Sequence, residues 1–142
     1  MYKKILIALE NSPADDSILA HVTELAAHFG SEILLLHVAD GFAARQFEQL
    51  KLAESEEMKA DRDHLEKVAE QLRARKLSVS TRLELGNPPT QIVKVAEIES
   101  CDLIGMAGHG HRLLGDIIHG STITEVRHKT EIPLLLVRAK IK

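Results

Sequence analysis

Four short and almost continuously apolar runs limit most strongly what this chain can fold into. They span Lys3–Leu9, Glu32–Val38, Asp102–Met106 and Ile132–Arg138. Runs of this kind are typical of strands that are covered on both faces, as in a parallel sheet. A fifth segment, Leu77–Leu85, alternates apolar and polar residues, which predicts a strand with one solvent-facing side at a sheet edge.

The segment between the first two runs has the pattern of an amphipathic helix. Ser12 is a candidate cap, Pro13 suits the first helical position, and the aspartates that follow favour the first turn. Gly30 predicts the end of this helix. The apolar stripe between these signals consists of Ile18, Leu19, Val22, Leu25, Ala26 and Phe29.

Three further helices are predicted between the remaining runs. The first is a charged segment without Gly or Pro from about Ala43 to Lys76, expected to be one long helix that is interrupted or loosely held near its start. Asn87–Pro88 forms a cap and first-position pair, and Thr122–Glu125 has the spacing of a capping box. The apolar positions of the long helix are Phe47, Leu50, Leu65, Val68, Ala69 and Leu72.

The alternation of strands and helices predicts an α/β fold with a doubly wound parallel sheet. The 142 residues suit one domain spanning the whole chain. A net charge of -3 without a basic stripe, and only 3% aromatic residues, argue against a nucleic-acid partner. No apolar segment approaches the roughly 18 residues that a bilayer span needs, and Glu10 interrupts the first run. We therefore expect a cytoplasmic protein with no membrane or nucleic-acid partner.

The segment Ala107–Thr122 is a long loop that follows an apolar run and opens a helix. In open α/β sheets, ligands bind outside the carboxyl ends of the strands, where the strand order reverses. Gly108, Gly110 and Gly120 in this loop let the backbone approach a ligand closely, and the free N–H groups of the next helix can hold an anion. Turns and caps alone would also explain these residues, but the length of the loop favours a phosphate site.

Two standard phosphate motifs do not fit this loop. A Walker A sequence needs a lysine after its last glycine, whereas Ser121 follows Gly120. The dinucleotide fingerprint needs a third glycine at the position of Leu113, and it follows the first strand rather than the fourth.

The loop resembles that of the universal stress protein family, whose nucleotide-binding members carry G-x2-G-x9-G-[S/T] after the fourth strand. Three of the four positions match with both spacings intact, at Gly110, Gly120 and Ser121. Ala107 stands where the family has its first glycine, and Glu10 stands where it usually has aspartate. The resemblance covers the whole chain and includes His37–Val38, Gly86-x-Pro88 and Ile132–Val137.

This resemblance implies a Rossmann-like fold, similar to the adenine nucleotide alpha hydrolases, with strand order 3-2-1-4-5. It also implies bound ATP or AMP, with adenine between Leu9, Val38 and Met106. Glu10 would lie near the ribose or assist a magnesium ion, the alternative being a solvated acid at a strand end. The implied binding residues are Ala8, Leu9, Glu10, Val38, Met106, Ala107, Gly108, His109, Gly110, Arg112, Gly120, Ser121 and Thr122.

Similar proteins dimerise through the fifth strand, so the resemblance also implies a homodimer through Pro133–Arg138. Other chemistry has little support in the residues. His109, His111 and His119 have only Asp116 as a carboxylate at a matching distance, which is weak evidence for a metal site.

No catalytic residues are expected. No nucleophile elbow surrounds Ser12, and the only cysteine, Cys101, is expected to be an ordinary, partly buried thiol. The leading hypothesis is a stress-response module that senses or signals through an adenine nucleotide. Two alternatives remain. One is a nucleotide-free dimeric interaction protein, in which the substitutions at Ala107 and Glu10 have removed the nucleotide site. The other is a slow magnesium-dependent ATPase that uses Glu10.

Overall fold

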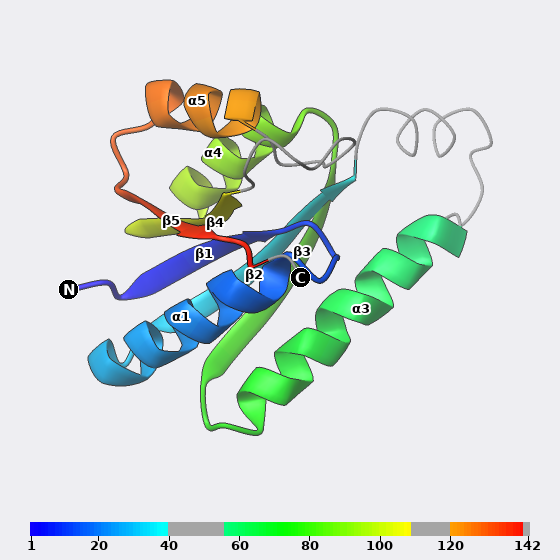
Figure 1. Ribbon diagram of the computed structural model, residues 1–142, viewed down its shortest axis with the longest axis vertical. Coiled ribbons are helices and arrows are strands. Elements are labelled where there is room, and N and C mark those ends of the chain that lie inside the picture. The colour runs from blue at the N-terminus through cyan, green and yellow to red at the C-terminus, as the bar shows by residue number, and fades with distance from the viewer. Residues whose placement is uncertain (40–55, 109–119, 141–142) are drawn as a thin grey trace.

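The computed structural model describes residues 1–39, 56–108 and 120–140. Strands and helices alternate along these residues (Figure 1). The elements are β1 (Lys4–Leu9), α1 (Asp15–Phe29), β2 (Glu32–Ala39), α3 (Glu56–Arg73), β3 (Ser78–Leu85), α4 (Pro88–Ile98), β4 (Leu103–Gly108), α5 (Gly120–Lys129) and β5 (Leu134–Arg138).

Some predictions fall outside the described residues. They include the first part of the predicted long helix, with Phe47 and Leu50, and much of the glycine-containing loop. The loop residues concerned are His109, Gly110, His111, Arg112, Asp116 and His119.

The five described strands form one parallel sheet in the order β3-β2-β1-β4-β5, which confirms the predicted fold. The chain starts at the central strand, moves outward through β2 to β3, and then returns to the other side of β1 as β4. The strand order therefore reverses between β1 and β4, where Ala8 is in register with Met106.

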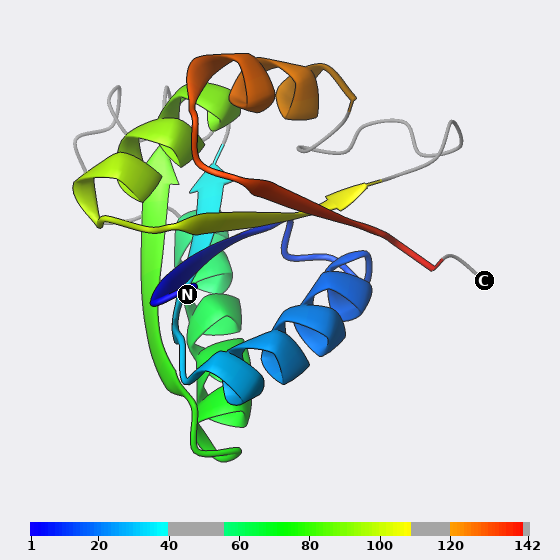
Figure 2. The ribbon, with the colours of Figure 1, turned by 90° about the vertical axis from the view of Figure 1, so that its left-hand side faces the viewer.

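Helices cover both faces of the sheet. Figures 1 and 2 show α1 and α3 on one face and α4 and α5 on the other. Strand β1 supplies Ile5, Ile7 and Leu9 to the core under α1 and α3, and Leu6 and Ala8 to the core under α4 and α5. Both sides of β1 are buried, which is why its sequence is apolar throughout.

Helix α1 begins later than the sequence predicts. Its first residue is Asp15 rather than Pro13, and Ala14 in the N-cap position makes no side-chain cap. The Ser12 hydroxyl instead accepts a hydrogen bond from the Ala14 N–H at 3.3 Å, in the turn before the helix. The predicted end at Gly30 is confirmed, because Gly30 has φ +67° in the left-handed region.

Two apolar residues do not lie where the helical patterns place them. Phe29, predicted on the core stripe of α1, is 40% exposed and packs edge-to-face on Tyr2. Met58 is buried, although its surroundings in the sequence are almost wholly polar. The other described apolar positions of α3 are buried as predicted, namely Leu65, Val68, Ala69 and Leu72.

Of the caps predicted for the last two helices, the cap of α4 is confirmed and the cap of α5 is not. The Asn87 side chain caps α4 as predicted, and its Oδ1 accepts a hydrogen bond from the Thr90 N–H at 3.2 Å. The predicted capping box at Thr122–Glu125 is wrong, because α5 already begins at Gly120 and Thr122 is buried in its first turn. The predicted edge position of β3 is confirmed.

Candidate functional site

The candidate site lies at the edge of the sheet where β1, β2 and β4 end. Leu9 and Glu10 lie at the end of β1, Ala39 at the end of β2 and Gly108 at the end of β4. Helix α5 leads back from this edge to the start of β5, so the N–H groups of its first turn belong to the same edge. The fold thus brings together β1 and the two ends of the loop that the sequence singled out.

The predicted binding residues divide between the two faces of the sheet. Ala8, Val38 and Met106 belong to the core under α4 and α5, whereas Leu9 and Ala107 belong to the core under α1 and α3. The predicted adenine position between Leu9, Val38 and Met106 thus joins side chains of both cores, and all three are buried, at 1%, 3% and 0% exposed.

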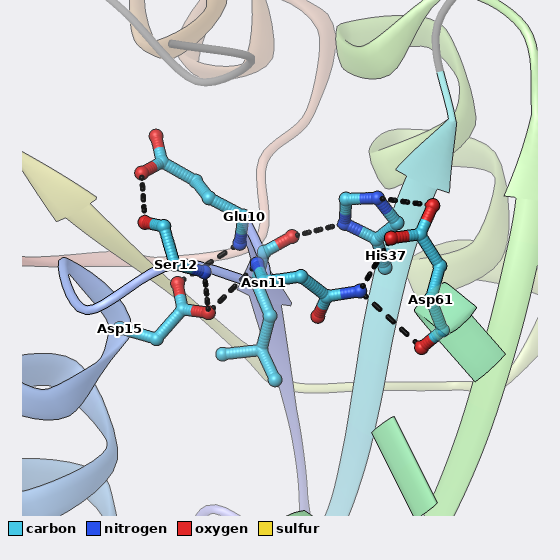
Figure 3. A network of polar contacts seen from close by, with 7 residues as sticks. Glu10, Asn11, Ser12, Asp15, His37 and Asp61 are labelled. Atoms are coloured by element: carbon cyan, nitrogen blue, oxygen red, sulfur yellow. Dashed lines mark hydrogen bonds and ion pairs between the residues drawn. The ribbon is translucent and has the colours of Figure 1, made fainter. Parts of the chain in front are cut away.

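Glu10 is the acidic residue at the reversal point of the sheet. Its side chain is only 7% exposed, so the interpretation as a solvated acid is wrong. The Ser12 hydroxyl donates a hydrogen bond to Glu10 Oε2 at 3.4 Å, and Figure 3 shows the carboxylate turned away from Asp15. A buried carboxylate needs hydrogen-bond donors or cations as partners, which suits hydroxyl or metal-ion recognition.

Asp15 holds the turn between β1 and α1 through three backbone donors. Its Oδ1 accepts from the Glu10 N–H at 2.9 Å, and its Oδ2 accepts from the N–H groups of Asn11 and Ser12 at 2.8 and 3.3 Å. Burial raises the pKa of the Asp15 carboxyl above its ordinary value, whereas these donors and nearby His37 lower it. From the sequence, Asp15 is expected only as a favourable charge in the first helical turn. Its position six residues after the end of β1 is the available signal.

A second polar group joins β1, β2 and α3 (Figure 3). Buried His37 lies with Nδ1 2.8 Å from the Leu9 carbonyl oxygen, and this nitrogen carries the proton because a carbonyl oxygen only accepts. The other ring nitrogen, Nε2, is 3.5 Å from Asp61 Oδ2. Asn11 Nδ2 donates to both the carbonyl oxygen and Oδ1 of Asp61, each at 3.3 Å.

The sequence does not indicate this second group as a unit. His37 belongs to the residues that carry the family resemblance, and Asp61 lies in a long polar stretch where nothing distinguishes it from its neighbours. Asn11 adopts φ +60°, a left-handed conformation that asparagine tolerates better than most residues. Its Oδ1 is buried, with no hydrogen-bond partner in the described part of the chain.

The two ends of the glycine-containing loop differ in exposure. Gly108 is half-buried at the end of β4, and a Cβ placed there would meet no atom within 4 Å. Ser121 is exposed and Thr122 is 4% exposed in the first turn of α5. Within the described ranges, packing thus does not require glycine at position 108.

Two features are absent from the described residues, namely a metal-binding cluster and a membrane-spanning helix. No group of three or more His, Cys, Asp and Glu side chains in residues 1–39, 56–108 and 120–140 could hold a metal ion. Of the helices in these ranges, none is both long enough and apolar enough to cross a bilayer.

Comparison with known proteins identifies the family. The model of the universal stress protein family matches residues 1–138, and the chain therefore belongs to this family. It is 32% identical over 160 residues to universal stress protein MJ0577 of Methanocaldococcus jannaschii, covering 99% of this chain and 97% of the relative.

Solved structures show the same fold. The structure of MJ0577 has a TM-score of 0.78 at 29% identity and covers 100% of this chain and 99% of that one. A universal stress protein from Archaeoglobus fulgidus in complex with dAMP has a TM-score of 0.70 at 18% identity, covering 96% of this chain and 98% of that one. Another universal stress protein, in complex with cAMP, has a TM-score of 0.69 at 13% identity and covers 98% of each chain.

Proposed function

We propose that this protein binds an adenine nucleotide, ATP or AMP, at the edge where β1 and β4 end, and senses or signals through it. The main support for the proposal is that the loop with the family's glycine spacing lies at this edge of the sheet. Gly110, Gly120 and Ser121 keep this spacing, and the loop connects the end of β4 to α5 beside the reversal of strand order. Ligands of open α/β sheets bind at such reversals.

Three further observations support an adenine nucleotide. Universal stress proteins of the same fold have been solved with dAMP and with cAMP. In this chain, the backbone N–H groups that open α5 suit an anion, and Ser121 and Thr122 add hydroxyl groups there. Gly108 leaves room beside the end of β4 that the packing of the described residues does not use.

Glu10 has two candidate roles in this site. Its buried carboxylate can accept hydrogen bonds from ribose hydroxyls, or it can assist a magnesium ion that bridges the phosphates. Glu10→Gln separates these roles. Loss of a ribose contact weakens AMP and ATP alike, whereas loss of a magnesium contact weakens only ATP and only when magnesium is present. Abolished ATP turnover in the same variant would support the slow ATPase instead.

The experiment that tests the proposal has two parts. The purified protein is denatured and any released small molecule is identified by mass spectrometry, and calorimetry then measures ATP and AMP binding to nucleotide-free protein. The proposal expects an adenine nucleotide in the first part or binding heat in the second. If no nucleotide is released and no binding heat is measured, the proposal is refuted. That result would favour the nucleotide-free interaction protein.

Gly120→Val provides a local test of the phosphate position. The added side chain at the start of α5 should weaken nucleotide binding by about tenfold or more. Ala27→Val is the control, because it places the same valine side chain at an exposed position of α1. Equal affinity in both variants would show that the phosphates bind elsewhere.

We also propose a homodimer through the outer edge of β5. This strand has a neighbour on one side only in the sheet of described strands, and Leu136 on it is 49% exposed. An apolar edge strand of this kind favours pairing with a second strand. Leu136→Lys should shift the protein toward monomer in sedimentation experiments, and an unchanged mass in wild type and variant would refute this interface.

A further inference from the structure

The turn between β1 and α1 already contains a bound anion, which is a side chain of the protein itself. The N–H groups of three consecutive residues, Glu10, Asn11 and Ser12, all point to the Asp15 carboxylate at 2.8 to 3.3 Å. Consecutive N–H groups that converge around a left-handed residue form a nest, the backbone concavity that binds phosphate in many nucleotide sites. Asn11 supplies the left-handed residue here, with φ +60°.

The contacts of Asp15 match those of a ligand in such a nest. Both carboxylate oxygens accept from the backbone, and the residue is only 2% exposed, so water contributes little to holding the charge. Hydrogen bonds from N–H groups to a charged acceptor are roughly twice as strong as neutral ones. The nest is therefore filled, and its donors are not available to another anion.

The remaining charges of the turn also disfavour a phosphate there. The Glu10 carboxylate lies on the side of the turn away from Asp15 (Figure 3), and exposed Asp16 follows in α1. A phosphate that approached this turn would thus face two or three acidic groups. The first turn of α5 offers backbone donors at the same edge of the sheet.

We propose that Asp15 is a specificity-determining residue, which fills the anion nest of the β1–α1 turn and directs the phosphates of the ligand to the start of α5. The second half of this statement rests on the proposed nucleotide binding, whereas the filled nest does not. Removal of the carboxylate should expose a new site for phosphate at the N–H groups of Glu10, Asn11 and Ser12.

Asp15→Ala with inorganic phosphate as the probe tests the nest directly. In amide NMR spectra, phosphate should shift the signals of residues 10, 11 and 12 saturably in this variant, with an affinity about tenfold or more above that of wild type. Asp16→Ala is the matched control, because it removes an equal charge from the neighbouring exposed position. A folded Asp15→Ala protein without these shifts, or equal shifts in wild type, would overturn the proposal.

Wild-type protein provides a second measurement if Asp15→Ala does not fold. The amide signals of residues 10, 11 and 12 should all titrate with the midpoint of the Asp15 carboxyl carbon, because protonation weakens all three hydrogen bonds together. Three amides that titrate independently of that carbon would overturn the proposal.

ATP separates the nest from the proposed function. In wild type, ATP should shift the amide signals of Gly120, Ser121 and Thr122 more than those of residues 10 to 12, and Asp15→Ala should spread the shifts to the latter. Larger shifts at residues 10 to 12 in wild type would overturn the directing role. If wild type binds no nucleotide, the proposed function fails and the directing role with it, while the phosphate experiment still decides whether Asp15 fills the nest.

Discussion

Asp61→Ala is expected to destabilise the protein although Asp61 lies on the solvent-facing helix α3. The substitution removes the carboxylate that faces His37 Nε2 at 3.5 Å and accepts from Asn11 Nδ2 at 3.3 Å. The Asp61 carboxylate can accept from His37 Nε2 only when this nitrogen also carries a proton, and Asn11 Nδ2 keeps its second acceptor, the Asp61 carbonyl oxygen. In that state the substitution leaves one buried nitrogen without its partner, and one hydrogen bond is lost.

The magnitude follows from these two losses. A net hydrogen bond contributes about 0.5 to 1.5 kcal/mol, and an unsatisfied buried polar group costs about 1 to 3 kcal/mol. Because the contacts are long and Asn11 stays partly paired, we expect a decrease of about 2 kcal/mol in the free energy of unfolding. With a urea m-value of about 2 kcal/mol per molar, the midpoint should move down by about 1 M.

Urea unfolding followed by circular dichroism measures this shift. Asp63→Ala is the control, because it removes the same charge from an exposed position of the same helix. Asp61→Asn should lie between the control and Asp61→Ala, since the amide can still hydrogen bond to both partners. Equal midpoints for Asp61→Ala and Asp63→Ala would refute the role assigned to these contacts.

Three further predictions concern packing, ionisation and capping. Gly105→Val should destabilise the protein by about 1 to 3 kcal/mol in the same urea assay, because a Cβ at Gly105 would lie 3.3 Å from one α1 side chain and 3.4 Å from another; an unchanged midpoint would contradict this. Burial raises the pKa of the Cys101 thiol to about 11 from a usual value of 9.0. The unfolded chain therefore releases this proton at a lower pH than the folded chain does. As a result, the free energy of unfolding should fall as the pH rises from 9.0 toward 11. Cys101→Ser should lack that part of the pH dependence, and identical pH profiles would contradict the assignment. Asn87→Ala should cost about 1 kcal/mol, because the Thr90 N–H loses its cap, and no loss of stability would show that the cap is replaceable.

Much of the fold was predictable because the pattern of apolar residues in a short segment indicates which of its faces are buried. The continuous apolar run of β1 indicated burial on both faces, and the signals at Gly30 and Asn87 indicated helix ends where the structure has them. Capping residue types were misleading at the starts of α1 and α5. Ser12 has the right residue type for a cap, but the Asp15 carboxylate accepts from the backbone of the turn before α1, and Thr122 lies buried inside α5.

Less of the site was predictable. The sequence singled out Glu10 by its place after an apolar run, but a solvated acid was one of its possible interpretations, and only the structure shows that it is buried. The separation of Leu9 from Val38 and Met106 depends on which side chains of neighbouring strands share a face, and register decides this.

The sequence by itself determined the alternation of strands and helices, the parallel sheet and the loop whose spacing matches the family. These are local properties, because burial, helix periodicity and glycine spacing are each encoded within a few turns of chain. Tertiary structure alone decided that Asp61 reaches His37 and Asn11 from a helix 50 residues away from Asn11. This contact depends on the packing of α3 against the end of β1, which no short segment of the sequence specifies.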